Sequence, residues 1–348
     1  MIIFYLNLIS IFFYWLLYKL IPNIQDKKNI FLKIIFIQLF IILSLRSEFT
    51  GTDTQRYIEL YDIVSTYNIS YLKEIYNKEF GFIILTKVIQ YITDSKQIYI
   101  AIIAIISLMG PYILIKNNSK NIFISIIVYI TFEQYAFIFS GLRQSIAISI
   151  FLIAMEYYKK DKKYIFILLI LLANTFHKSV MITLLLILIK DINIPQKLII
   201  YIYILSISYI FKGLIVGLIT NYLYSDYANS SNVGGGYSIL VLFLLLLSFG
   251  YIYGKKYFSE NKNSGLFYNM IGIALILQVY ASVEGNINRL VMYFSTFLVI
   301  YIPMILYFFK NKKLRVLLSY ITIIILISKY LIGINNSALV KSYSLFWK

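Results

Sequence analysis

Two arginines open apolar segments of the chain, where a positive charge is costly. Arg143 follows a Ser-Gly pair, and Arg289 ends a polar turn before another apolar run. An arginine near the bilayer costs about 2.5–3.5 kcal/mol on insertion scales, so it needs an anion, a carbonyl or the headgroups. Arg143 could extend to lipid phosphate, but a cation in the first turn of a helix opposes the helix dipole unless an anion is bound. We therefore predict that Arg143, its neighbour Gln144 and Arg289 bind an anionic substrate group.

Four further residues are candidates for substrate binding. Glu284 begins the polar turn before the second arginine, and Tyr293 lies one helical turn after it. Arg46 ends an earlier apolar segment, and Tyr57 follows in a polar stretch. Simpler explanations exist, because Arg46 could only mark the membrane interface, where tyrosines also gather, and Asn288 could cap the next helix. Capping alone does not explain the arginine that ends the turn.

Three side chains could accept a proton from a substrate hydroxyl. Asp53 lies in a Gly-Thr-Asp-Thr sequence, Glu79 lies in a Glu-Phe-Gly sequence, and His177 is the single histidine of the chain. A carboxylate or imidazole held at a reacting hydroxyl can act as a general base. The alternatives are an Asx turn at Asp53, an ordinary acid at a helix start for Glu79 and an interfacial histidine without a task. Among these catalytic candidates we rank Asp53 first and His177 second.

The elements that must position these residues are membrane helices. The chain has 348 residues, of which 60% are hydrophobic and 14% charged, and its mean hydropathy is +0.80. Soluble globular proteins have about 25% charged residues, so the composition excludes a soluble enzyme. A spanning helix needs ~20 apolar residues, and we predict an all-α bundle of about 12 transmembrane helices. It forms one membrane domain, residues 1–348. The apolar runs are residues 1–20, 29–45, 98–115, 121–139, 142–158, 164–176, 180–189, 198–211, 237–253, 266–282, 290–309 and 314–332.

The basic residues indicate the orientation of the bundle. More than half of the 32 lysines and arginines lie in alternate loops or at the adjoining helix ends. Such an excess is typical of cytoplasmic loops. Both termini and the loop of residues 46–97 are then extracytoplasmic, and within this loop residues 82–92 are expected to form an amphipathic helix that does not cross the membrane. All the candidate site residues fall on this outer face.

The residues and motifs that the chain lacks exclude several kinds of functional site. The chain has no cysteine and one histidine, which excludes thiolate sites, disulfides and multi-histidine metal sites. It also has no Asp-x-Asp pair, no dinucleotide-binding fingerprint and no Walker A pattern. We therefore expect no cofactor and no bound metal. The net charge of +17 indicates topology and anionic lipid rather than nucleic acid.

In their order along the chain, these pieces resemble the EpsG family, part of the Wzy-like polysaccharide polymerases. The resemblance runs over Arg46, residues 51–54 with Tyr57, residues 79–81, Arg143-Gln144 with Ala147, the lysine-rich inner loop, residues 176–179, and Arg289 with Tyr293. Val180 stands where an alanine would be more usual, and the long outer loop of larger relatives is short here.

The resemblance implies a C-type glycosyltransferase (GT-C-like) architecture in the cytoplasmic membrane of a bacterium. It further implies that oligosaccharide repeat units on undecaprenyl pyrophosphate are joined into exopolysaccharide, capsule or O-antigen on the outer face of that membrane. Membrane lipids, a chain-length regulator and a flippase are the partners that such a polymerase would have.

The resulting hypothesis is glycosyl transfer with lipid pyrophosphate as the leaving group. Arg143 and Arg289 would bind the pyrophosphate. One of the three general-base candidates, Asp53, Glu79 or His177, would accept the hydroxyl proton. A flippase for the same lipid is the first alternative, because it would also need arginines for pyrophosphate. An acyltransferase that modifies surface polysaccharide ranks third, because no acid lies within the turn that contains His177.

Overall fold

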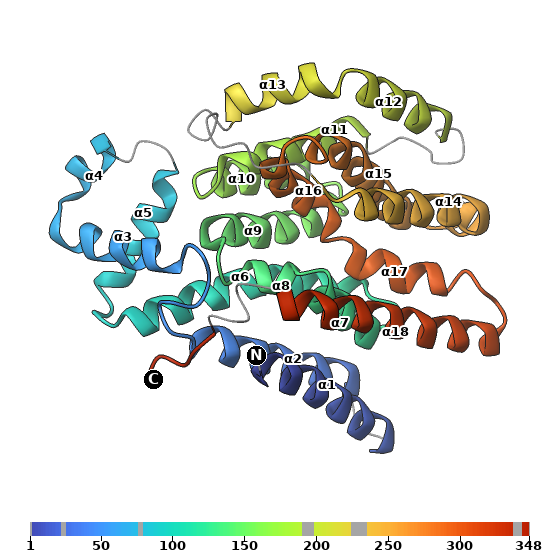
Figure 1. The fold of residues 1–348 in the computed structure, drawn as a ribbon, viewed down its shortest axis with the longest axis horizontal. Coiled ribbons are helices and arrows are strands. Elements are labelled where there is room, and N and C mark those ends of the chain that lie inside the picture. Colours follow the sequence, from blue (N-terminus) through green and yellow to red (C-terminus); the bar gives the residue numbers. More distant parts are fainter. Residues whose placement is uncertain are drawn as a thin grey trace. The chain divides into compact units, whose positions relative to one another are not determined.

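The computed structural model describes residues 2–21, 26–75, 79–189, 198–223, 235–336 and 343–347. Within these ranges every regular element is a helix, so the predicted all-α class is confirmed (Figure 1). An isolated antiparallel bridge pairs Arg46 with Leu345. The chain divides into two compact units, Met1–His177 with Ile321–Lys348, and Lys178–Tyr320. A single membrane domain over residues 1–348 stays a prediction.

Five of the described helices are long and apolar enough to cross a bilayer. They are α1 (Ile2–Leu20), α6 (Lys96–Asn118), α14 (Tyr237–Glu260), α15 (Lys262–Ala281) and α18 (Lys312–Asn336). Two bent pairs raise the number to seven: α12 (Leu198–Ile210) with α13 (Lys212–Leu223), at 79°, and α16 (Asn288–Ser295) with α17 (Leu298–Leu306), at 53°.

The predicted number of about twelve spans is not confirmed, and neither is the GT-C-like architecture. The physical reason is length, because several apolar runs form helices well below the ~20 residues that a span needs. Examples are α7 (Ile122–Thr131) and α10 (Lys163–Asn174). The remaining short elements are α8 (Gln134–Phe137), η1 (Lys178–Leu185), α11 (Leu186–Ile189) and η4 (Gly285–Ile287).

In the first unit, α9 (Leu142–Tyr158) packs between α6 and α10 (Figure 1). The backbone N–H of Gly110 in α6 donates to Ser149 Oγ in α9 at 2.8 Å, and this hydroxyl donates to the Ile106 carbonyl at 2.5 Å. The serine hydroxyl thus bridges an N–H and a carbonyl within one turn of α6. This turn lies next to Pro111, which has no N–H to donate. Because lipid supplies no water to backbone groups, the neighbouring helix satisfies them.

The opposite end of α9 is fixed to α6 by a polar network. Glu156 accepts hydrogen bonds from Asn117 Nδ2 at 3.0 Å and Asn118 Nδ2 at 2.9 Å, and it pairs with Lys159 Nζ at 2.7 Å. The side chains of Lys159 and Glu156 are only 9% and 13% exposed. A buried charge is tolerated when it is paired and hydrogen-bonded, so this network holds the two helices together.

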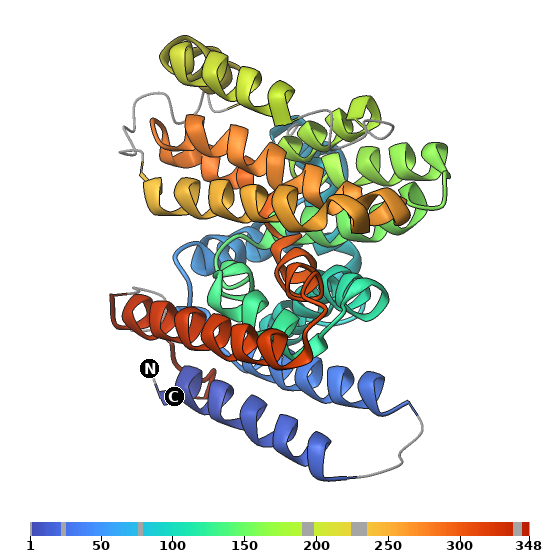
Figure 2. The ribbon, with the colours of Figure 1, turned by 90° about the vertical axis from the view of Figure 1, so that its right-hand side faces the viewer.

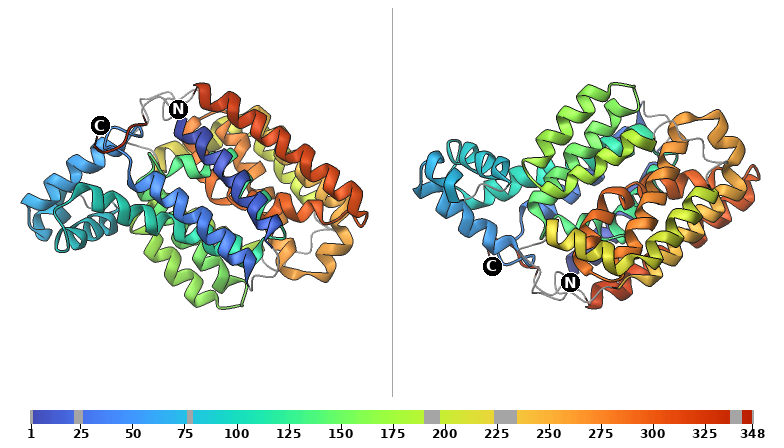
Figure 3. Two further views of the ribbon diagram at one scale, coloured as in Figure 1. Left: turned by 90° about the horizontal axis from the view of Figure 1, so that it is seen from below. Right: turned by 90° about the horizontal axis from the view of Figure 1, so that it is seen from above.

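Three short helices of the predicted outer loop lie together at the N-terminal end of α6 (Figures 1 and 3). They are α3 (Thr54–Thr66), α4 (Ile69–Ile75) and α5 (Phe80–Gln90). A helix forms at Phe80–Gln90, where an amphipathic helix was expected over residues 82–92. That this helix does not cross the membrane stays a prediction. Lys87, which interrupts its apolar face, donates to the carbonyls of Val64 at 2.7 Å and Tyr67 at 3.1 Å. These carbonyls end α3, where a cation is favoured by the helix dipole.

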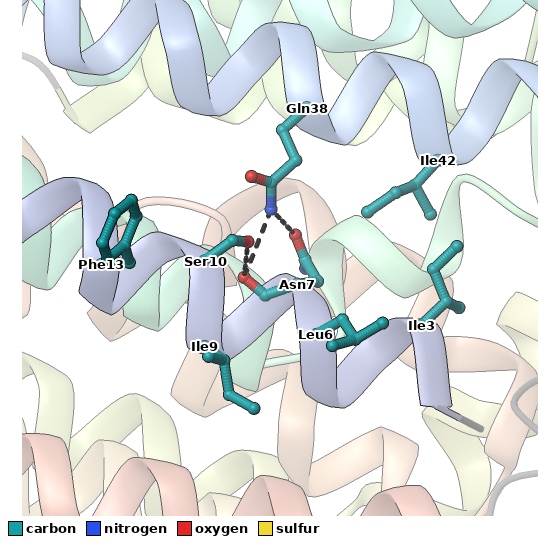
Figure 4. A pocket seen from close by; sticks show the side chains of 8 residues that line it. All are labelled: Ile3, Leu6, Asn7, Ile9, Ser10, Phe13, Gln38 and Ile42. Atoms are coloured by element: carbon teal, nitrogen blue, oxygen red, sulfur yellow. Dashed lines mark hydrogen bonds between the residues drawn. The ribbon is translucent and has the colours of Figure 1, made fainter.

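Helices α1 and α2 (Lys27–Ser44) pack against each other (Figure 2). An open groove of about 440 Å³ lies along them, and Figure 4 shows the side chains that line it. Its lining is mostly apolar and includes Leu6, Phe13 and Ile42. Gln38 Nε2 donates to Asn7 Oδ1 at 2.5 Å across the two helices. An amide pair of this kind fixes the register of two apolar helices in lipid.

The second unit is built around α15, which is almost entirely buried. It packs against α14 and α16. Tyrosine hydroxyls cross between helices here: Tyr201 donates to Asn269 Oδ1 at 2.9 Å, and Tyr280 donates to Ser208 Oγ at 2.8 Å. These tyrosines therefore contribute to packing inside the bundle, beyond the interfacial role that is typical of tyrosine in membranes.

We predict that Gly110→Ala destabilises the first unit. An added Cβ would lie 2.4 Å from the Ser149 carbonyl oxygen and 2.5 Å from its Cα, so α6 and α9 must move apart. Overpacking of this kind costs about 1–3 kcal/mol, which thermal unfolding of the purified protein in detergent would detect. Gly213→Ala in α13 is the control, because no described atom lies within 4 Å of its added Cβ. Equal stability of the two variants would contradict this packing.

Candidate functional site

Glu79 is the centre of the candidate site, because its carboxylate binds two side chains from other helices. Arg143 Nη1 lies 2.8 Å from Glu79 Oε2, and His177 Nδ1 lies 2.5 Å from Oε1. Glu79 precedes α5, Arg143 is in the first turn of α9, and His177 follows α10. The Glu79 and His177 side chains are 12% and 15% exposed, whereas Arg143 is 40% exposed. Three residues predicted separately are therefore brought together.

Backbone geometry explains how Glu79 reaches His177. Glu79 has a φ of 59°, a left-handed conformation that is uncommon for residues other than glycine. Two residues later, the Gly81 N–H donates to the Thr175 carbonyl at 2.9 Å. A Cβ on Gly81 would lie only 2.1 Å from Thr175 Oγ1, so only glycine permits this approach. The Glu-Phe-Gly sequence thus anchors the start of α5 beside the residues that lead to His177.

The second ring nitrogen of His177 has no hydrogen-bond partner in the part of the chain that the structure describes. Nε2 is buried and accepts or donates no hydrogen bond among the described residues. Since an ionised carboxylate only accepts hydrogen bonds, Nδ1 carries the proton that faces Glu79, and in the neutral ring Nε2 is then an acceptor. A buried polar atom without a partner costs about 1–3 kcal/mol. Such an atom in a native structure calls for an explanation, such as a bound water or ion or a catalytic role.

Tyr57 of α3 adjoins the arginine of this group. The guanidinium carbon of Arg143 lies 5.7 Å from the centre of the Tyr57 ring, within the range of a cation–π contact. Burial raises the pKa of the Tyr57 phenol, and the nearby positive charge of Arg143, which is also its hydrogen-bond partner, only partly offsets this. The negative charges of Asp53 and Glu79 raise this pKa further. Tyr57 therefore stays protonated at neutral pH and can donate a hydrogen bond.

The Gly-Thr-Asp-Thr loop is tied to the residues before α9. Thr54 Oγ1 donates to the Phe139 carbonyl at 2.7 Å, and the Thr52 N–H donates to Ser140 Oγ at 3.1 Å. Gly51 has a φ of 97°, which favours glycine. Asp53 is half-buried and stands at the N-cap of α3, yet its side chain makes no capping hydrogen bond. Helix capping therefore does not account for this carboxylate.

Gln144 and Arg46, two of the predicted binding residues in the first unit, are buried. Gln144 is 3% exposed and lies inside the helix packing of α9. Arg46 is 2% exposed and contacts the Ile138 carbonyl and the Phe139 ring. Phe139, Ser140 and Thr175 were not predicted as site residues. Only the Ser-Gly pair before Arg143 gave a sequence signal for this region.

The remaining candidates lie in the second unit. Tyr293 is fully buried in α16, and its hydroxyl lies 3.1 Å from Ser179 Oγ. Glu284 Oε1 accepts the Asn286 N–H at 3.1 Å and so caps η4. Arg289 is half-buried in the first turn of α16, as expected. Asn288 is not the N-cap, because that position is taken by Ile287.

A family model now adds to this geometry. The model described as the EpsG family matches residues 29–346. The chain belongs to the EpsG family. This match covers all ten candidate site residues, and it confirms the resemblance stated from the sequence. No curated protein and no solved structure matches the chain. With its apolar helices, this EpsG protein is a membrane protein of polysaccharide biosynthesis.

One argument from the sequence does not hold in three dimensions. The acyltransferase was ranked third because no acid lies within the turn of His177, but Glu79, 98 residues earlier, supplies one at 2.5 Å. The acid comes from the residue that precedes α5, which inspection of one turn does not reveal. The pairing of an imidazole with a carboxylate is therefore available to any reaction that deprotonates a hydroxyl.

We predict that Gly81→Ala in this EpsG protein strongly reduces polysaccharide output. The new methyl group would displace Thr175 or α5 and so separate Glu79 from His177, and a 1 Å misplacement can cost about 100-fold in rate. Output is measured in cells that lack their own copy, with protein level as the control. Thr175→Gly in the same chain should restore part of the output, because it removes the atoms that the methyl meets. Normal output from Gly81→Ala would contradict this explanation of the glycine.

Proposed function

We propose that this EpsG protein is a polysaccharide polymerase. It would join oligosaccharide repeat units carried on undecaprenyl pyrophosphate at the outer face of the bacterial cytoplasmic membrane. The observation that carries the proposal is the carboxylate of Glu79 shared between Arg143 and His177. This group combines a cation for a leaving pyrophosphate with a base for an attacking hydroxyl, which are the two requirements of glycosyl transfer from a lipid pyrophosphate.

His177 is the proposed general base. Glu79 holds Nδ1, so the lone pair of Nε2 is available to a substrate hydroxyl,. The sequence analysis ranked Asp53 first, and we now favour His177 because Asp53 has no comparable partner among the described residues. Asp53 lies close enough to Tyr57 to influence its ionisation. We propose that Asp53 binds an acceptor sugar hydroxyl.

Arg143 is the residue proposed to bind the pyrophosphate. Its guanidinium is 40% exposed while it contacts Glu79, and it carries five N–H donors in one plane. A planar guanidinium binds phosphate oxygens through two parallel hydrogen bonds, which lysine cannot do. The Tyr57 hydroxyl, which stays protonated beside Arg143, is a further hydrogen-bond donor to the pyrophosphate. Arg289 is a second arginine candidate in its own unit, and its contribution is tested below.

The chemical step follows from these roles. The hydroxyl oxygen of the acceptor sugar attacks the anomeric carbon of the donor sugar while His177 Nε2 takes the hydroxyl proton. The bond between the anomeric carbon and the pyrophosphate oxygen breaks, and undecaprenyl pyrophosphate leaves with the bonding electron pair. Arg143 stabilises the negative charge that grows on the leaving group. The imidazolium formed at His177 is stabilised by Glu79.

A membrane acyltransferase is the second candidate, and the His177–Glu79 pair is the observation that favours it. In that reaction the same base would deprotonate a sugar hydroxyl that attacks an acyl carbon. Membership of the EpsG family supports the polymerase instead. The products distinguish the two, because an acyltransferase changes the mass of one repeat unit and a polymerase multiplies it.

Reconstitution tests the proposal. The purified protein in liposomes should convert the undecaprenyl-pyrophosphate oligosaccharide of its host into a gel ladder of repeat multiples. His177→Gln should lower the rate about 10²–10⁴-fold, as expected for loss of a general base. Arg143→Ala should abolish the ladder, and Arg143→Lys should restore little of it. Arg56→Ala, which removes an exposed arginine of α3, is the matched control and should retain activity.

Other results would change the assignment. Transfer of the lipid across the liposome membrane without a ladder would indicate a flippase, and acylated repeat units would indicate an acyltransferase. A full ladder from Arg143→Lys would refute a two-bond contact with pyrophosphate. Loss of the ladder in Arg289→Ala would add this second arginine to the machinery, and its retention would remove it.

Single cysteines test the proposed face of the membrane, since the chain has no cysteine of its own. Glu59→Cys in α3 and Lys162→Cys before α10 are both at exposed positions. We predict that a membrane-impermeant thiol reagent applied to whole cells labels Glu59→Cys and not Lys162→Cys. After the cells are opened, both should react. The reverse pattern would overturn the orientation.

A further inference from the structure

Arg46 is a buried cation that has no acidic partner among the described residues. Its side chain lies after the end of α2 and is 2% exposed. Among the described residues its one hydrogen bond is a long contact of 3.5 Å from Nη1 to the Ile138 carbonyl, and Nε has none. The guanidinium also lies 5.1 Å from the centre of the Phe139 ring. No described carboxylate forms an ion pair with Arg46, unlike Arg143, which has Glu79.

This environment is poor for a purely structural arginine. Burying a charge without an opposite charge costs several kcal/mol, and one long hydrogen bond with one ring contact is small compensation. Burial lowers the pKa of Arg46 to about 10, so the side chain is still a cation at neutral pH. An anion that enters this space would supply the missing charge and accept the hydrogen bonds that the protein does not provide.

Residues 343–347, here called the strap, cover this part of the first unit. The Ser47 N–H donates to the Ser344 carbonyl at 2.9 Å, and the Phe346 N–H donates to the Leu45 carbonyl at 3.1 Å. The hydroxyls of Ser47 and Ser344 are 2.7 Å apart. The strap thus pairs with the backbone on both sides of Arg46, immediately before the Gly-Thr-Asp-Thr loop.

Tyr343 connects the strap directly to the arginine. Its ring makes edge contacts with Phe4 at 5.6 Å and with Phe139 at 6.1 Å, and Phe139 is the ring that Arg46 faces. Burial raises the pKa of Tyr343 to about 12, while the charge of Arg46 acts in the opposite direction. The phenol therefore stays neutral and near the guanidinium without compensating its charge. The strap is also held by the hydrogen bond from the Tyr343 hydroxyl to the Ile42 carbonyl at 3.0 Å, and its displacement would uncover Arg46.

We propose that Arg46 is the cationic end of a phosphate-binding site that residues 343–347 cover. The ligand is a phosphate or diphosphate group, because a buried guanidinium recognises its oxygens through paired hydrogen bonds. The source is either a polyprenyl lipid or a free anion. This site goes beyond the proposed transfer reaction, since binding at Arg46 requires no chemistry at His177.

Binding to the purified protein tests the ligand class. Calorimetry with farnesyl diphosphate and with inorganic pyrophosphate should detect binding that Arg46→Met weakens by about tenfold or more. Arg56→Met, an exposed arginine replaced in the same way, should bind like the wild type. Binding of both probes assigns the site to any diphosphate, and binding of farnesyl diphosphate alone assigns it to a lipid. Binding that is absent, or equal in the wild type and Arg46→Met, would overturn the proposal.

Thermal unfolding separates a binding arginine from a structural one. Replacement of an uncompensated buried charge by an apolar side chain of similar length is often neutral or stabilising. Arg46→Met should therefore keep or raise the melting temperature while it loses the shift that pyrophosphate induces. A lower melting temperature together with an unchanged pyrophosphate shift would assign Arg46 to structure alone.

A reversible crosslink tests the strap. Ser47→Cys with Ser344→Cys should form a disulfide, because the two hydroxyls are in contact and the chain has no other cysteine. The oxidised protein should lose binding of farnesyl diphosphate about tenfold or more, and reduction should restore it. Unchanged binding after complete oxidation would refute the covering role. Because the readout is binding, these results stand whether or not the protein forms polymer.

Discussion

One carboxylate determines the arrangement of the candidate site. Glu79 binds Arg143 and His177 at once, and the three residues come from elements that are far apart in the chain. A carboxylate has room for several donors, so it can orient an imidazole and a guanidinium together. Without it, the imidazole and the guanidinium would lose the acceptor that orients both of them. The packing of α5, α9 and α10 therefore brings these three side chains into contact.

Two close backbone approaches make the contact possible. Gly81 lies against Thr175, and Gly110 lies against Ser149. The first brings α5 to the end of α10, and the second brings α6 to α9. Both positions exclude a side chain, because the atoms they meet include backbone atoms that cannot rotate away. The chemistry of the site thus depends on two residues that carry no functional group.

The sequence predicted the helical class and the residue types of the site, because hydropathy and isolated charges are local properties. Arg143, Glu79 and His177 were each identified as candidates. Their convergence was not predicted, since a contact across 98 residues depends on how three helices pack. For this reason Asp53 was ranked above His177. The same limitation affects the count of spans, because a bend such as the one between α16 and α17 divides the apolar run of residues 290–309 without a signal in composition.

The attachment of α9 has a mechanical consequence. This helix is held near its start by Glu79, in its middle by the Ser149 hydroxyl within α6, and at its far end by the Glu156 network. Because these contacts lie near the start, in the middle and at the far end of α9, the helix does not slide or rotate as a unit. Arg143 therefore keeps a fixed position. In the proposed role of Arg143, substrates of different size would meet its guanidinium at one position, and the short helices α3, α4 and α5 would adjust to their bulk.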